Sequence, residues 1–235
     1  ERNRFFSGPA IRMPDGINAN AEEFTYAAWI YADTDYRYAS GLQRFFDFGN
    51  DVRDSFYLRY VPSTGETCFQ DRGVAASSSD PNSLITATLE DNPFADKWAH
   101  LVVTYEKSTE GEYYTPHIYI DGVERYEFDN SLTTLTRDFG DAVSSSGSNY
   151  GMWIGKTQWA FDSSQAANNP EFKGKMDEIR LYDRALTASE VTELYNSKKP
   201  SDVPVDYDSM PQTKIAITED VEVSTAYTDT NREGQ

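Results

Sequence analysis

The sequence has little of the chemistry on which disulfide-bonded proteins, zinc proteins and nucleophilic enzymes depend. It contains one cysteine, Cys68, so no intrachain disulfide framework is expected and the thiol should be buried. It contains two histidines, His100 and His117, each inside a strand-like stretch. No Cys/His pairing, Gly-x-Ser-x-Gly motif or HxxxxH-type spacing is present. We therefore expect structural roles for both histidines and no nucleophilic catalysis.

Basic residues and long apolar runs are also scarce. There are 21 Lys and Arg against 39 Asp and Glu, which gives a net charge of −18. Such a surface repels phosphate backbones, so no nucleic-acid partner is expected. No apolar run approaches the roughly 20 residues that a membrane-spanning helix needs, and we expect no membrane insertion. An acidic chain rich in Tyr, Asp, Ser and Thr is typical of a secreted or cell-surface module.

Aromatic and β-branched residues, in contrast, are abundant and recur in strand-length stretches between turn residues. These stretches lie at 24–32, 43–48, 55–61, 97–105, 117–121, 123–128, 150–156 and 175–182, with weaker candidates at 5–13 and 83–89. Between two of them, Asp121-Gly122 predicts a tight hairpin turn, because glycine tolerates positive φ. The pattern predicts an all-β fold, an antiparallel two-sheet sandwich of the jelly-roll type.

The segment after residue 174 carries two local signals. Met176 and Ile179 cannot both face a core along strict alternation, which predicts a β-bulge between them. Farther on, Thr187 and Glu190 form a capping box, and Leu186 with Val191 can form the hydrophobic staple. The sequence therefore predicts one short helix, at residues 188–196.

The composition changes after Ser197 to KKPSDVPVDYDSMP, which is typical of a linker. We expect one sandwich domain at 1–197. The remaining 198–235 would be a linker followed by an extra edge strand or the start of a neighbouring domain, because 214–227 alternates like a strand. The chain is then a monomeric module within a larger secreted or surface protein.

A set of ordered motifs resembles one known family. The stretches KWAHLVVTYE, HIYIDGVERY, WIGK and FKGKMDEIRLYDRALTASEVTELY, preceded by FFSGPAIRMPDG and EEFTYAAWIYA, resemble laminin-G-like jelly-roll domains of the concanavalin A-like superfamily. The resemblance covers about residues 5–197. It implies an extracellular module that binds glycans or proteins without catalysis and that often holds Ca²⁺. Fold alone does not fix function.

Catalysis is the weakest interpretation. Glycoside hydrolases among the relatives carry two carboxylates about 5 Å apart, commonly as Glu-x-Asp-x-x-Glu, and that pattern does not occur here. The adjacent Asp177 and Glu178 would point to opposite faces of a regular strand. We expect no enzyme, with a glycoside hydrolase or polysaccharide lyase as a remote alternative.

Calcium requires hard oxygen ligands, which loops often supply. The stretch FDFGNDVRD offers Asp47, Asn50 and Asp51, and the family-like closing motif adds Asp177. The competing interpretation is a solvated turn for Asp51 and a hydrogen-bonded strand-end carboxylate for Asp177. The sequence leaves both open.

A glycan site needs an exposed aromatic face together with side chains that hydrogen-bond hydroxyl groups. The loops 33–42 and 157–171 have this composition. Their candidate carbohydrate-binding residues are Tyr36, Arg37, Tyr38, Trp159, Phe161, Asp162, Asn168 and Asn169. The alternative is that the aromatic residues roof the core.

Three further tryptophans, Trp29, Trp98 and Trp153, lie in strands and are expected in the core. The resulting hypothesis is a carbohydrate-binding, lectin-like module, with a protein-binding adhesin or spacer as the alternative.

Overall fold

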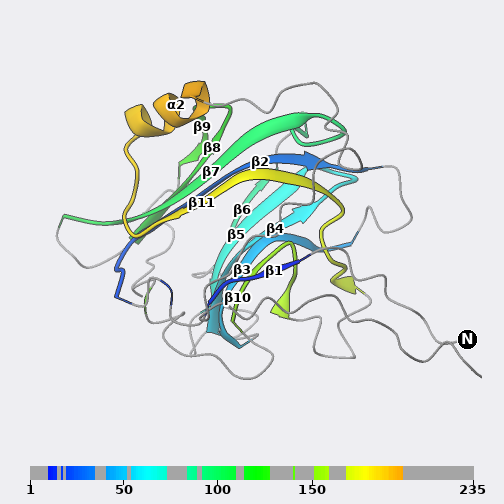
Figure 1. The fold of residues 1–235 in the computed structure, drawn as a ribbon, viewed down its shortest axis with the longest axis horizontal. Coiled ribbons are helices and arrows are strands. Elements are labelled where there is room, and N and C mark those ends of the chain that lie inside the picture. The colour runs from blue at the N-terminus through cyan, green and yellow to red at the C-terminus, as the bar shows by residue number, and fades with distance from the viewer. Residues whose placement is uncertain are drawn as a thin grey trace, which may run out of the picture. The chain divides into compact units, whose positions relative to one another are not determined.

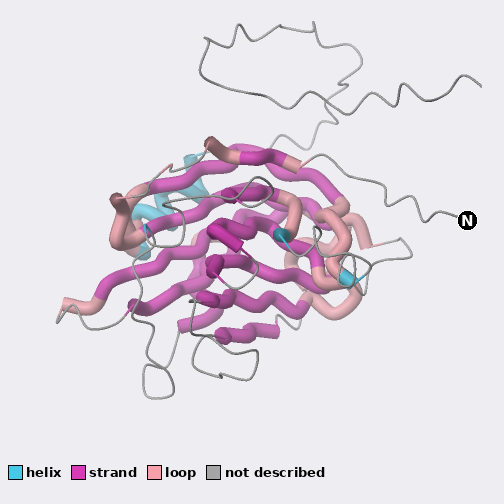
Figure 2. The backbone as a smooth tube through the Cα atoms, turned by 90° about the horizontal axis from the view of Figure 1, so that it is seen from below, coloured by secondary structure: helices cyan, strands magenta, loops and turns pink. Residues whose placement is uncertain are grey.

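The chain folds into two antiparallel β-sheets that pack face to face, as a computed structural model shows (Figure 1). The structure describes residues 10–14, 17, 20–34, 41–51, 54–72, 84–88, 92–109, 114–127, 140, 151–158 and 168–197. Figure 2 shows the strands running side by side, with the helix outside them. The predicted antiparallel sandwich is confirmed.

The first sheet has six strands, in the order β1-β10-β3-β4-β5-β6. They are β1 (Ile11–Arg12), β10 (Gly151–Ile154), β3 (Gln43–Asp51), β4 (Asp54–Val61), β5 (Glu66–Arg72) and β6 (Leu84–Thr88). The sequence pattern does not predict β5, because its ETCFQDR stretch has one large apolar residue, Phe69, among polar ones. Cross-strand pairing with β4 along the whole of β5 holds it in the sheet instead.

The second sheet has five strands, in the order β11-β2-β7-β8-β9. They are β11 (Gly174–Tyr182), β2 (Phe24–Ala32), β7 (Trp98–Lys107), β8 (Tyr114–Ile120) and β9 (Val123–Glu127). The β8–β9 turn has positive φ at Asp121 (53°) and Gly122 (78°), as the predicted primed hairpin turn requires.

Aromatic residues from the inner faces of both sheets make the main core. The largest fully buried side chains are Tyr26, Tyr60, Tyr105, Tyr114, Phe24, Phe45, Phe46, Phe48, Phe56, Phe69 and Phe94. Phe24 of one sheet, for example, meets Phe46 and Phe56 of the other edge-on, with ring centroids 6.1 and 5.9 Å apart. Edge-to-face contacts suit the aromatic quadrupole and add to the gain from burial.

The predicted bulge lies in β11. The register with β2 shifts between Asp177 and Arg180, and Glu178 has a φ of 49°. The extra residue allows Met176 and Ile179 both to pack against the core. Strict alternation along β11 would have turned one of them to solvent.

Helix α2 (Ala188–Ser197) covers part of the outer face of the five-stranded sheet. The capping box is formed: the Thr187 N–H donates to Glu190 Oε2 (2.9 Å), and the Glu190 N–H donates to Thr187 Oγ1 (3.3 Å). Leu186 and Val191 are buried in one cluster with Val102. The predicted helix and its staple are thus confirmed.

Cys68 is buried and forms no disulfide within the described residues. No helix in the described ranges has the length and apolar character needed to cross a membrane. The predicted linker and strand at 198–235 lie outside the described residues, so the domain boundary stays a prediction.

Candidate functional site

The glycan-binding residues predicted from sequence belong to two loops, and the structure describes the bases of both. Tyr36, Arg37 and Tyr38 of the first loop, and Trp159, Phe161 and Asp162 of the second, lie outside the described residues. Of the remaining candidates, Asn168 is exposed and Asn169 is buried. These two are therefore not equivalent, because only Asn168 is open to a ligand.

Backbone hydrogen bonds join the bases of the two loops. The Asp33 N–H, directly after β2, donates to the Lys173 carbonyl at 3.0 Å. The Leu42 N–H, directly before β3, donates to the Asn168 carbonyl, also at 3.0 Å. Both ends of loop 33–42 are thus tied to residues 168–173, at the end of loop 157–171 and directly after it. Two segments more than 120 residues apart in sequence form one rim of the sandwich.

Arg44 of β3 holds the C-terminal part of loop 157–171. Its Nη1 donates to the Leu42 carbonyl (3.0 Å) and its Nη2 to Asn169 Oδ1 (3.3 Å). The guanidinium lies 4.3 Å from the centroid of the Tyr57 ring, a cation–π contact. Arg44 thus links the end of loop 33–42 to loop 157–171 from below.

Asp47, three residues after Arg44 in β3, holds the beginning of loop 157–171. Its Oδ2 accepts hydrogen bonds from Thr157 Oγ1 (3.0 Å) and the Gln158 N–H (3.1 Å), and its Oδ1 accepts one from Gln158 Nε2 (3.1 Å). Arg44 Nε lies 3.9 Å from Asp47 Oδ2. Both ends of the loop are therefore seated on one buried ion pair.

Burial governs the electrostatics of this pair. Desolvation raises the pKa of the Asp47 carboxyl, against the opposing effects of Arg44 and of hydrogen bonds from Gln158 and Thr157. Desolvation also lowers the pKa of the Arg44 guanidinium, while Tyr57 and Asp47 oppose that change. Each charge is tolerated because the other charge and several dipoles compensate it. The Arg44–Asp47 pair, called the anchor below, therefore depends on both charges and on the hydrogen bonds to them.

The proposed calcium ligands do not converge within the described part of the chain. The oxygens of Asp47 already accept three hydrogen bonds, and Asp177 lies in the other sheet, where its Oδ1 accepts from the Glu178 N–H at 2.8 Å. Side chains of Asn50 and Asp51 are not described. No group of three or more His, Cys, Asp or Glu in the described ranges could hold a metal. Calcium binding stays a prediction.

For Trp98 and Trp153 the predicted core position is wrong, whereas Trp29 is buried as predicted. Each sits on an outward-facing strand position: Trp153 pairs with Asp47, Trp29 with His100, and Trp98 with Tyr31. Trp29 is buried all the same, 4% exposed, while Trp98 and Trp153 are partly exposed. Alternation shows which residues share a face, but not which face turns inward.

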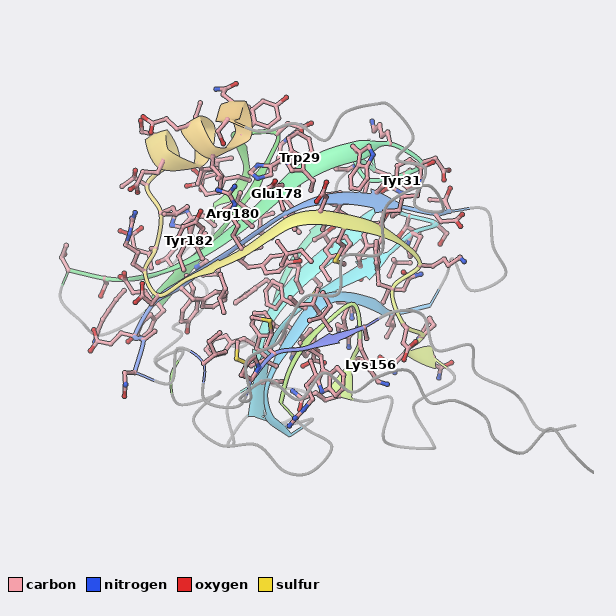
Figure 3. All side chains as sticks on the ribbon, viewed as in Figure 1. Trp29, Tyr31, Lys156, Glu178, Arg180 and Tyr182 are labelled. Atoms are coloured by element: carbon pink, nitrogen blue, oxygen red, sulfur yellow. The ribbon has the colours of Figure 1, made fainter. Side chains whose placement is uncertain are left out.

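On the outer face of the six-stranded sheet, an ion pair lies beside Trp153. Lys156 Nζ lies 5.3 Å from the Trp153 ring centroid and 3.1 Å from Glu171 Oε1. Since Lys156 directly precedes loop 157–171 and Glu171 is its last residue, this pair also ties the loop ends together. Figure 3 shows Lys156 on the side of the molecule opposite Trp29 and Tyr31.

The titratable groups that could serve catalysis have structural partners. His100 packs against Trp29 and Tyr195, with ring centroids 5.1 and 6.0 Å away, and burial lowers its pKa to about 4. His117 Nδ1 lies 2.6 Å from Glu124 Oε1. Glu178, beside Asp177 in the bulge, contacts Arg180 Nη2 at 2.8 Å. Each of these side chains is accounted for by packing or charge pairing.

Comparison with known proteins places this geometry in a wider context. A family model described as "Concanavalin A-like lectin/glucanases superfamily" (Laminin_G_3) matches residues 7–192, which confirms the resemblance. No curated protein matches the chain.

Several solved structures are similar to it. The CBM40 of the Ruminococcus gnavus IT-sialidase, bound to α2,3-sialyllactose, is 12% identical; the match covers 80% of this chain and 96% of that one, with a TM-score of 0.52. Domain 4 of AbnA, a GH43 extracellular arabinanase from Geobacillus stearothermophilus, in complex with arabinotriose, is 22% identical (79% and 72% covered, TM-score 0.49). A putative carbohydrate-binding protein from Bacteroides ovatus is 21% identical, and the match spans 73% of this chain and 40% of that one (TM-score 0.44).

Proposed function

The chain belongs to the concanavalin A-like lectin/glucanases superfamily, and we propose that it is a non-catalytic carbohydrate-binding module. The observation that carries this proposal is the pairing of loops 33–42 and 157–171 at their bases, Leu42 to Asn168 and Asp33 to Lys173. Both loops contain aromatic residues for stacking on sugar rings and polar residues for their hydroxyl groups. A shared base lets them act on one ligand.

The buried Arg44–Asp47 pair supports a binding role for the rim. A loop that must order itself on binding loses affinity through conformational entropy, whereas a pre-ordered loop does not. Hydrogen bonds from Thr157 and Gln158 at one end and to Asn169 at the other fix the ends of loop 157–171. Because the loop ends are already held in place, less conformational entropy should be lost when a ligand binds.

Two considerations support a module without catalysis, outside the cell. The carboxylate pattern of the hydrolases is absent from the sequence, and the histidines have structural partners. The acidic composition, rich in Tyr, Asp, Ser and Thr, suits an extracellular environment. We place the module in a secreted or cell-surface protein.

Trp159 is the residue to test. If it stacks on a sugar, Trp159→Ala should weaken glycan binding by about 1–3 kcal/mol, by analogy with base stacking on aromatic side chains, and leave the melting temperature nearly unchanged. Trp159→Phe, which keeps an aromatic face, should retain most of the affinity. A glycan array in the presence and absence of EDTA identifies the sugar used for the titration.

The competing role for Trp159 makes the opposite prediction. A Trp159 that roofs the core would cost roughly 3–5 kcal/mol of stability on truncation to alanine and change binding only indirectly. Loss of stability with intact affinity would reject the loop assignment. An array on which the protein binds no glycan at all would reject the proposed function.

A further inference from the structure

Helix α2 covers only part of the outer face of the five-stranded sheet. Leu186 and Val191 lie over Ala27 and Val102, in one buried cluster. One row farther along β2, Tyr195 packs on Trp29 with ring centroids 5.7 Å apart. The helix coverage thus explains why a large aromatic residue can occupy the outward-facing position 29.

The next row on this face holds two more aromatic residues, and they are partly exposed. Tyr31 of β2 pairs with Lys175 on one side and Trp98 on the other. The Tyr31 and Trp98 rings meet edge to face, with centroids 5.9 Å apart at 64°. The β7–β8 pairing begins only at Leu101 and Ile120, so no β8 residue pairs with Trp98. Figure 3 shows Tyr31 on the same side of β2 as Trp29 and α2.

The exposed part of the Tyr31 and Trp98 side chains does not contribute the stability that full burial would give. Burial of apolar surface contributes about 25 cal/mol per Å², so a Tyr and a Trp at partly exposed positions lose part of their possible contribution. Trp153 on the other sheet is a useful contrast, because Lys156 lies over its ring and is itself paired with Glu171. Among the described residues, Trp98 contacts no aromatic ring besides Tyr31. A partner that covers these rings would account for them.

The polar side chains beside the rings indicate the chemistry of that partner. Lys175 is exposed, its Nζ lies 5.2 Å from the Tyr31 ring centroid, and it makes no ion pair within the described part of the chain. Asp177, two residues along β11, is also exposed and pairs across from Trp29. Aromatic faces flanked by one donor and one acceptor suit the apolar face and the hydroxyl groups of a sugar. The two charges balance, which favours a neutral ligand.

We propose that Tyr31, Trp98, Lys175 and Asp177 form a second stacking subsite for a neutral oligosaccharide, on the outer face of the five-stranded sheet. The subsite rests on the proposed function for its ligand class, but not on the loops for its residues. It adjoins the loop rim, since Asp33 follows Tyr31 by two residues and bonds to Lys173, two residues before Lys175. An extended glycan chain could occupy both.

The test titrates wild type and the variants Trp98→Ala and Tyr31→Ala with the neutral oligosaccharide that binds best on the array. Each variant should bind about 5- to 150-fold more weakly, the equivalent of one lost stacking contact. Val123→Ala is the control: it removes an exposed apolar side chain from β9, at the far edge of the same sheet, and should bind like wild type. Melting temperatures are measured for every variant.

A measurement on the wild-type protein guards against variants that fail to fold. In hydroxyl-radical footprinting, bound oligosaccharide should protect Tyr31 and Trp98 and leave Tyr182, at the other end of β11, as reactive as before. Unchanged affinity in both variants, with Trp159→Ala impaired, overturns the subsite and leaves the loop site standing. Weakened binding in the Trp98 and Tyr31 variants but not in Trp159→Ala supports the subsite and overturns the loop assignment. Binding confined to acidic glycans and abolished by salt overturns the subsite.

Discussion

Removal of the Asp47 carboxylate should be among the most destabilising single changes in the described part of the chain. Asp47→Ala leaves the buried Gln158 N–H and side-chain amide without their acceptor, and it leaves the buried Arg44 guanidinium without its counter-ion. Breaking a buried pair by removing one partner costs about 3–5 kcal/mol. For a domain of this size each kcal/mol lowers the melting temperature by about 2–4 °C, so we expect a fall of about 6–20 °C.

Thermal unfolding followed by circular dichroism or calorimetry measures this effect. The control is Glu193→Ala, which removes a carboxylate from the exposed face of α2 and should change stability by less than about 0.5 kcal/mol. The double variant Arg44→Ala/Asp47→Ala should cost less than the sum of the two single variants, because neither charge is then left alone. An Asp47→Ala protein that melts within about 2 °C of wild type would refute the anchoring argument.

Three further predictions concern pH and metal. Burial lowers the pKa of His100 from 6.5 to about 4, so the folded state should lose stability as pH falls from 6.5 towards 4. In thermal melts, the His100→Gln variant should lose less stability than wild type over that interval. Hydrogen bonds from Arg184 and Thr187 lower the pKa of Glu190 from 4.5 to about 2. The stability that ionised Glu190 contributes is therefore fully present above pH 4.5 and is lost as pH falls towards 2. In urea denaturation, Glu190→Gln should lose less stability than wild type over this pH range. The calcium hypothesis predicts a higher melting temperature in excess Ca²⁺ than in EDTA, since an ion that binds only the folded chain stabilises it, and identical curves would reject it.

Local sequence signals predicted the elements that depend on local chemistry. The capping box at Thr187 and Glu190, the Asp121-Gly122 turn and the bulge between Met176 and Ile179 each follow from residues a few positions apart. Strands with several large apolar residues were found as well. The strand β5 was not, because its place depends on pairing with β4 and not on its own pattern.

The site depends on contacts that sequence spacing does not reveal. Arg44 and Asp47 are ordinary polar positions in a strand, and their partners Asn169 and Gln158 lie 125 and 111 residues away. A hydrophobic pattern also cannot show that a helix from the end of the chain buries Trp29 from outside the sandwich. The single signal that could have found the anchor is two opposite charges at i and i+3 in an otherwise aromatic strand.

The division between anchor and surface determines how variants of this protein should be interpreted. With one cysteine the chain cannot cross-link its loops by an internal disulfide. The described bases are held by backbone hydrogen bonds, by the Lys156–Glu171 ion pair and by hydrogen bonds from Arg44 and to Asp47. A change in that pair alters stability and, by releasing the loop ends, also alters the entropy lost on binding. A change at Trp98 should alter binding with little effect on the fold, because the ring is partly exposed and lies outside the core. Stability and affinity should therefore fall together for Asp47→Ala and separately for Trp98→Ala; joint loss in both variants would mean that the sheet surface belongs to the scaffold and not to a binding site.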